Sequence, residues 1–370
     1  MMRRSVATRS VDVVLLVYIG ILLLFGLIML TSASSVIAYD KFGDAYFFVK
    51  RQLLFGVVPG LIGFLFFAKM PYEWLKKFGS ILFYSSLALL ILVLIPGIGA
   101  TFNTGARSWI ALGAFSFQPA ELAKLGLICY LAYYMSVIGH KIQDLKQGFI
   151  PVLIVGMLPI GLTMLQPDIG TASILFATLF SLLFIGHAKA SHLSLLAALA
   201  VFAFIILIAV APYRAARLTT FLHPELDPQG IGYHINQSYL AIGSGGWLGY
   251  GLGHSRQKFQ YLPEVHADSI FAVIAEELGF IVTSGFLCLL VLFAWRCVSI
   301  AKRCRDEYGR LLVMGIISWF MIQSFFNIAA MVGLMPITGV PLPFVSHGGT
   351  SLAIALSAVG IIANVSKQSS

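Results

Sequence analysis

Residues 13–33 read VVLLVYIGILLLFGLIMLTSA, an apolar stretch without a charged side chain. A helix needs about 20 apolar residues to cross the hydrocarbon core of a bilayer. The stretch therefore predicts a transmembrane helix. It is longer than the apolar core of a signal peptide and no Ala-x-Ala cleavage site follows it, so we expect it to be retained as a first span.

The same character extends along the 370 residues. Hydrophobic residues make up 59% of the chain and charged residues 11%, and the mean hydropathy is +0.92. Soluble domains carry about 25% charged residues and disorder requires low hydrophobicity, so both classes are excluded. We predict an all-α polytopic membrane protein, a single domain over residues 1–370, with ten transmembrane helices. Its other apolar runs are 46–68, 79–97, 118–138, 149–166, 170–187, 190–211, 270–296, 309–333 and 348–366.

The basic residues predict the orientation of these helices. With a cytoplasmic N-terminus, the outer segments before residue 212 contain only Lys41, Lys50, Arg51 and Arg107. The inner segments then contain Arg3, Arg4, Arg9, Lys69, Lys76, Lys77, Lys141, Lys146, Lys189, Arg296, Lys302, Arg303, Arg305, Arg310 and Lys367. This bias follows the positive-inside rule, so both termini are expected in the cytoplasm. The net charge of +9 thus orients the chain in a membrane, and we predict no nucleic-acid partner.

One long connection departs from the pattern of short loops. Residues 212–269 form a large extracytoplasmic loop between spans seven and eight, and the loop is rich in tyrosine, phenylalanine and tryptophan. Long loops in compact proteins are usually functional or disordered, and the aromatic content argues against disorder. Its glycine-rich part, residues 243–253, lacks the preceding strand and following helix of a dinucleotide site, so we expect no nucleotide there and a flexible backbone close to a ligand or an interface.

Charged residues inside or beside the spans are the first functional candidates. Each costs about 2.5–3.5 kcal/mol at a span centre. Glu121 and Lys124 share a helix face, so they can pair with each other or present a basic site to an anionic lipid headgroup. Asp168 is expected to cap the helix that follows it.

Asp268 is the last acid before the apolar run 270–296. It can cap that helix, but Ser269 can cap equally well. Asp268 would then be available as a general base, with a pKa raised by partial desolvation. Glu276 and Glu277, two turns further, are expected to pair with buried polar groups. The Pro-rich and Gly-rich segment 341–351 suggests broken backbone around a cavity where the outer ends of spans four, eight and ten converge.

Cofactor signals are weak. The histidines show no zinc-binding spacing, and the four cysteines are expected to be reduced thiols. Oxygen-only Mg²⁺ sites leave little trace in a sequence, so a divalent cation, Mg²⁺ or Mn²⁺, stays open.

Four segments together resemble the SEDS family of bacterial cell-wall polymerases, the FtsW and RodA proteins. They are GARSWI (105–110) with FQPAELAK (117–124), QPDIGT (166–171), the stretch 227–272, and LPFVSHGG (342–349). They occur in family order across nearly the whole chain, and the family also has ten spans. Two segments depart from the family pattern. Ala267 and Ser269 stand where the family usually has Thr and Phe, and His347 stands where it usually has Tyr. The segments 251–258 and 364–366 look closer to FtsW than to RodA.

The resemblance implies an inverting glycosyltransferase that polymerises lipid II at the outer face of the bacterial inner membrane, in division or elongation, and releases polyprenyl pyrophosphate. Asp268 would be catalytic. The candidate substrate-binding residues are Arg107, Gln118, Glu121, Lys124, Asp168, Arg214, Arg217, Ser346 and His347. A class B penicillin-binding protein, a transpeptidase, is the implied partner.

Two other classes remain open: a lipid II flippase or proton-coupled transporter, and a non-catalytic divisome scaffold. A transporter places its ionisable groups near the membrane midplane, whereas Arg107, Asp168 and Asp268 are predicted at the outer boundary. This placement favours the polymerase.

Overall fold

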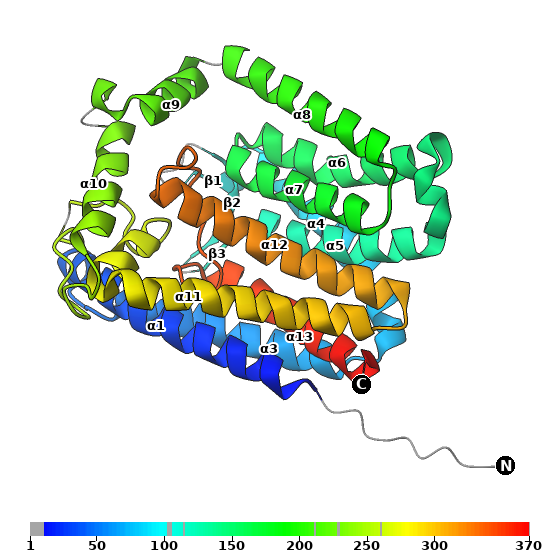
Figure 1. The fold of residues 1–370 in the computed structure, drawn as a ribbon, viewed down its shortest axis with the longest axis horizontal. Coiled ribbons are helices and arrows are strands. Elements are labelled where there is room, and N and C mark those ends of the chain that lie inside the picture. The colour runs from blue at the N-terminus through cyan, green and yellow to red at the C-terminus, as the bar shows by residue number, and fades with distance from the viewer. Residues whose placement is uncertain are drawn as a thin grey trace.

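A computed structural model describes residues 11–101, 106–113, 115–210, 212–227, 230–259 and 261–369, and these residues are mostly helical (Figure 1). The helices are α1 (Val13–Phe42), α2 (Phe47–Gln52), α3 (Val58–Lys69), α4 (Tyr72–Leu94), α5 (Pro119–Ile138), α6 (Ile150–Leu165), α7 (Ile169–Ile185), α8 (Ala190–Val210), α9 (Pro212–Leu222), α10 (Ile231–Ser244), α11 (Ile270–Arg303), α12 (Glu307–Met331) and α13 (Gly349–Ser369). Short π-helical or 3₁₀ turns cover Leu53–Val57, Gly139–Gln143, Leu145–Phe149 and Pro224–Leu226.

Each of the ten predicted apolar runs contains a helix. In the described part of the chain, nine helices are long and apolar enough to cross a membrane, and α7 is a shorter apolar helix of 17 residues. The largest shift is in α1, which ends at Phe42 rather than at residue 33, and α4 begins at Tyr72 rather than at residue 79. The reason is that Pro71 sets the start of this helix, whereas hydropathy rises only after Lys76 and Lys77.

Two details differ from the all-α prediction. Strands β1 (Gly99–Ala100), β2 (Trp109–Leu112) and β3 (Phe115–Phe117) form a small antiparallel sheet in the order β1-β2-β3. The segment 212–269 contains α9 and α10 and is therefore more regular than a loop. The strands and the helices α9 and α10 lack the long apolar runs on which the sequence prediction depended.

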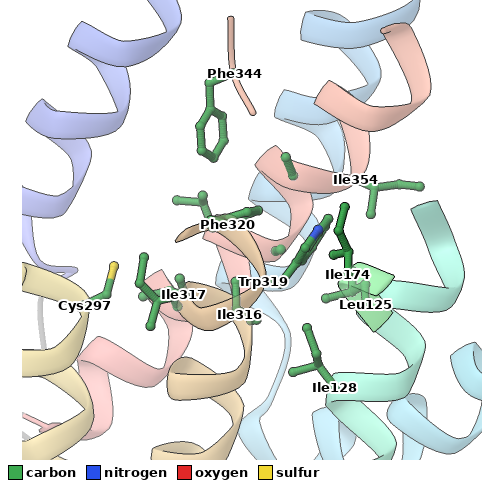
Figure 2. Packing of buried hydrophobic residues seen from close by; sticks show 14 of the residues in the cluster. Leu125, Ile128, Ile174, Cys297, Ile316, Ile317, Trp319, Phe320, Phe344 and Ile354 are labelled. Atoms are coloured by element: carbon green, nitrogen blue, oxygen red, sulfur yellow. The ribbon is translucent and has the colours of Figure 1, made fainter. Parts of the chain in front are cut away.

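The helices run side by side in a bundle whose two ends differ (Figure 1). α1 begins and α13 ends at one end, while α9 and α10 lie at the other. Figure 2 shows part of the core, where Trp319 and Phe320 of α12 lie among Leu125, Phe344 and Ile354. Packing of these side chains joins α5, α12, α13 and the segment that precedes α13. The arginines Arg3, Arg4 and Arg9, used in the orientation argument, lie outside the described residues.

The longest helix, α11, is broken at Gly279. This residue has φ 68° and ψ −177°, a conformation that is essentially restricted to glycine. On the N-terminal side of the break, Tyr250 N donates to Glu276 O (3.1 Å) and Gly251 N donates to Glu277 O (2.8 Å). The glycine-rich segment thus supplies donors for helix carbonyls that the break leaves unpaired.

The same segment also accepts hydrogen bonds from the far side of the break. Phe280 N donates to Gly246 O (2.9 Å) and Ile281 N donates to Trp247 O (3.2 Å). The approach is so close that a Cβ on Gly249 would lie 2.2 Å from Glu277 O. Residues 243–253, expected close to a ligand or an interface, therefore pack against the broken α11 of the same chain. A helix can break at membrane depth when neighbouring groups satisfy its backbone in this way.

We expect Gly279→Ala to destabilise the protein strongly. A Cβ at this position would lie 2.3 Å from Gly249 N, and the positive φ alone costs about 1–3 kcal/mol for a residue with a side chain. Thermal unfolding of the purified protein in detergent measures the loss. Gly285→Ala in the same helix is the matched control, because nothing lies within 4 Å of its added Cβ. Equal stability of the two variants would contradict the interpretation.

Candidate active site

Asp268 lies immediately before α11 in a segment whose backbone is held on several sides. Asn327 Nδ2 donates to Asp268 O at 2.7 Å. Ser346 Oγ donates to Ala267 O at 2.5 Å, and His347 N donates to His266 O at 2.8 Å. The position of Asp268 is therefore set by α12 and by the segment that precedes α13.

The side chain of Asp268 is buried, with 8% of its surface exposed. Ser269, not Asp268, occupies the N-cap position of α11. Burial is the main reason that the pKa of Asp268 rises to about 7, and the negative charge of Glu264 adds to it. A carboxyl group with such a pKa can exchange a proton near neutral pH, as a general base requires.

Ser269 connects Asp268 to His234 of α10. Its Oγ lies 2.6 Å from His234 Nε2 and 3.5 Å from Asp268 Oδ1, and it donates to Pro263 O at 2.8 Å. Burial lowers the pKa of His234 to about 4, so the ring is neutral at physiological pH. Because the serine hydroxyl already donates to a carbonyl, we assign the proton of His234 to Nε2, which donates to Ser269.

Glu121 and Lys124 form an ion pair, one of the two arrangements that the sequence left open. Lys124 Nζ lies 2.9 Å from Glu121 Oε1, and the two side chains are 1% and 2% exposed. Lys124 Nζ also donates to Gln323 Oε1 at 2.7 Å and lies 5.1 Å from the centre of the Trp319 ring. Trp319 Nε1 donates to the same Gln323 oxygen at 2.7 Å. Lys124 is thus fixed by a carboxylate, an amide and an aromatic ring.

Two amides of α12 connect this ion pair to Asp268. Gln323 Nε2 donates to Pro341 O at 2.9 Å, and Asn327 Nδ2 donates to Val340 O at 2.8 Å as well as to Asp268 O. The result is one buried polar chain from α5 through α12 to Asp268. Gln323 and Asn327 were not among the residues predicted from the sequence, although their four-residue spacing on one face of an apolar helix is a signal that can be recognised.

The contacts join α5, the start of α11 and the segment before α13, as expected for spans four, eight and ten. α12 takes part as well, which the sequence analysis did not foresee. Ser346 and His347 both contact the backbone before Asp268, as described above. A polar cavity of ≈ 30 Å³ lies beside His347 and is also lined by Arg51, Phe55, Ser116 and Gly349.

The other candidate residues are more dispersed. Asp168 caps α7 as predicted: it accepts from Thr171 N at 3.0 Å and from Thr171 Oγ1 at 2.8 Å. Gln118 Nε2 donates to Asp168 Oδ2 at 3.4 Å, so these two candidates lie together. Arg107 is exposed. The side chains of Arg214 and Arg217, on α9, lie outside the described residues.

Glu276 and Glu277 are buried and accept hydrogen bonds from polar groups, as expected. Within the described ranges, no group of three or more His, Cys, Asp or Glu side chains could hold a metal ion. The divalent cation therefore stays a prediction without assigned ligands.

The apolar helices form the bundle of a polytopic membrane protein. Near one end, this bundle contains a polar site made of a buried carboxyl group, an ion pair and two amides. The family to which it belongs follows from comparison with known proteins. The model of the FtsW/RodA/SpoVE family, described as "Cell cycle protein", matches residues 13–370, and the chain belongs to this family.

Relatives and solved structures agree with this membership. The chain is 43% identical over 360 residues to stage V sporulation protein E of Bacillus subtilis, covering 97% of this chain and 98% of the relative. It is 41% identical over 365 residues to a probable peptidoglycan glycosyltransferase FtsW of Trichlorobacter lovleyi, covering 99% and 95%. The crystal structure of the rod shape determining protein RodA of Thermus thermophilus matches with a TM-score of 0.72 at 27% identity, covering 96% and 97%.

A further solved chain matches with a TM-score of 0.79 at 28% identity and covers 96% of this chain and 98% of its own length. It comes from work described as "Structural coordination of polymerization and crosslinking by a peptidoglycan synthase complex".

Proposed function

We propose that this chain is a peptidoglycan glycosyltransferase that polymerises lipid II at the outer face of the bacterial inner membrane. Membership of the family and the FtsW relatives named as peptidoglycan glycosyltransferases support this activity. In the proposed topology ten spans place both termini in the cytoplasm. The outer end of the bundle then carries α9, α10 and Asp268.

Asp268 is the proposed catalytic base, and its burial at the start of α11 is the observation that carries the proposal. Its carboxylate takes the proton from the 4-hydroxyl of the acceptor sugar. The oxygen attacks C1 of the donor sugar, the new C1–O bond forms with inversion, and the bond from C1 to the diphosphate oxygen breaks. The electron pair leaves with polyprenyl pyrophosphate.

Charge develops on the diphosphate as it leaves, and cationic side chains stabilise such charge. Arg107 is the leading candidate, because its side chain is exposed two residues before β2. Arg214 and Arg217 are further candidates. Lys124 is buried against Glu121 and Gln323, so we propose that it contributes mainly by holding the polar chain in place. Gln118, Asp168, Ser346 and His347 complete the proposed substrate site.

The direct test is polymerisation of lipid II by the purified chain together with its partner transpeptidase. A class B penicillin-binding protein is the proposed partner, supported by the match to a chain of a peptidoglycan synthase complex. Glycan strands separated by gel electrophoresis are the product to measure. A flippase would instead translocate lipid II in liposomes without forming strands, and a scaffold would retain its role after substitution of Asp268.

The pH dependence of polymerisation follows from the raised pKa of Asp268. The base must be ionised to accept a proton, and burial raises its pKa to about 7. We therefore expect kcat to fall as the pH drops through about 7 and to level off above it. A profile measured at saturating lipid II tests this, and a rate that stays constant down to pH 5 would contradict it.

A further inference from the structure

A buried ion pair joins the two ends of the segment 258–277, which contains Asp268. Lys258 Nζ lies 2.9 Å from Glu277 Oε1, and the two side chains are 3% and 0% exposed. The partners are 19 positions apart in the sequence, and Asp268 lies near the middle of the stretch between them. Beside this pair, Ser255 Oγ donates to Glu276 Oε2, so two neighbouring contacts close the same stretch.

Each partner of the ion pair has further contacts. Glu277 accepts from Ser32 Oγ of α1 at 2.6 Å, from Gly253 N at 3.0 Å and from Ser255 N at 3.3 Å. Lys258 Nζ also donates to Gly253 O at 2.7 Å. These bonds attach the segment 253–258 both to α1 and to the first part of α11. Buried charges need this degree of compensation.

The part of α11 before Gly279 is consequently a short helix held at both ends. Its N-terminal end is fixed where Asn327 and Ser346 bind the backbone of residues 267 and 268. Its C-terminal end is fixed by the break at Gly279 and by Glu277. Loss of the ion pair would leave one buried charge without a partner. It would also free the two ends of the segment 258–277 from each other, which increases the conformational freedom of that segment.

We propose that Lys258 and Glu277 are positioning residues for Asp268, and that their ion pair determines where the Asp268 carboxylate meets the acceptor hydroxyl. The inference rests on the proposed function, in which Asp268 is the base. Neither residue contacts the reacting atoms in this arrangement. They act through the short helix and through residues 259–267, which both lead to Asp268.

The test uses the full chain with its partner transpeptidase and the variants Lys258→Met and Glu277→Gln. We expect kcat per folded molecule to fall about 10-fold to 100-fold with KM for lipid II nearly unchanged, because a displacement of about 1 Å can cost that much in rate. Lys258→Arg keeps the positive charge and is expected to recover most of kcat. Glu277→Gln keeps an acceptor oxygen for Ser32 and Gly253, so it decides the outcome if Lys258→Met does not fold.

The pH profile separates positioning from a purely structural role. A displaced Asp268 becomes better hydrated, so the acid limb of kcat should move to lower pH in the variants. Among the described residues, Glu264 acts on the charge of Asp268, and His234 is linked to Asp268 through Ser269. His266, two residues before Asp268, packs against His347, and all four groups are unchanged in the variants. The proposal would be overturned if the variants gave fewer folded molecules but kept the wild-type kcat and the wild-type acid limb of the pH profile.

Hydrogen exchange provides a readout that needs no substrate. We expect the amides of residues 264–270 to exchange faster in Lys258→Met and Glu277→Gln than in the wild type. Glu307→Gln is the matched control, because it breaks the Glu307–Arg310 pair of 2.5 Å at the start of α12. Wild-type exchange in both test variants would refute the positioning role. Failure of the proposed function would appear separately, as strand formation that survives Asp268→Asn.

Discussion

Asp268→Asn is expected to reduce lipid II polymerisation about 100-fold to 10,000-fold, the range that a positioned general base contributes. Asparagine preserves the size of the side chain and removes only the ability to accept the proton. The contacts that hold the segment use the backbone oxygens of residues 266–268, so the substitution leaves them in place. The protein should therefore fold normally and fail in the chemical step.

Strand formation from lipid II by the purified complex measures this effect, and thermal unfolding verifies that the variant is folded. Asp168→Asn is the informative comparison, because Asp168 caps α7 and contacts Gln118 rather than the start of α11. Because Asp168 also belongs to the proposed substrate site, we expect this variant to lower stability and to raise KM for lipid II, with a far smaller fall in kcat than in Asp268→Asn. If Asp268→Asn formed strands at a rate close to that of the wild type, the assignment of the base would be wrong.

Lys124→Met is expected to cause the largest loss of stability among single substitutions of the polar chain. It leaves Glu121 buried without its cation, and breaking a buried ion pair by removing one partner costs about 3–5 kcal/mol. The amide of Gln323 also loses one of its two donors. Thermal unfolding in detergent should show a clear drop in the midpoint temperature relative to the wild type.

The double variant Glu121→Gln/Lys124→Met provides the control for charge. Replacing both members of a buried pair is often close to neutral, so the double variant should be more stable than Lys124→Met alone. Lys50→Met is the control for position, because the Lys50–Asp44 pair of 2.7 Å is exposed and its loss should leave the midpoint within error. A structural role of the Glu121–Lys124 pair would be contradicted if Lys124→Met were as stable as the wild type.

Much of the helix arrangement was predictable because its cause is local. An apolar run of about 20 residues must be helical in a bilayer, since lipid offers no partner to an unpaired backbone group. The pairing of Glu121 with Lys124 and the capping by Asp168 were predictable for the same reason, as both act over three residues of one helix. Asp268 could be singled out because carboxylates at the edge of a span are rare.

The partners of these residues were not predictable from spacing. Gln323 lies 199 positions from Lys124, and Asn327 lies 59 positions from Asp268. The glycine-rich segment predicted a backbone close to a ligand or an interface, but not that it completes the broken α11. Lys258 was not a candidate at all, because a lysine in an extracytoplasmic segment is normally exposed.

The sequence by itself therefore determined the class of protein, the apolar helices and which polar residues needed an explanation, because transfer into lipid penalises each polar group individually. Only the tertiary structure decided that α12 connects Lys124 to Asp268 and that Lys258 pairs with Glu277. Those contacts depend on which helix ends meet, and they stabilise buried charges that no single helix could satisfy alone.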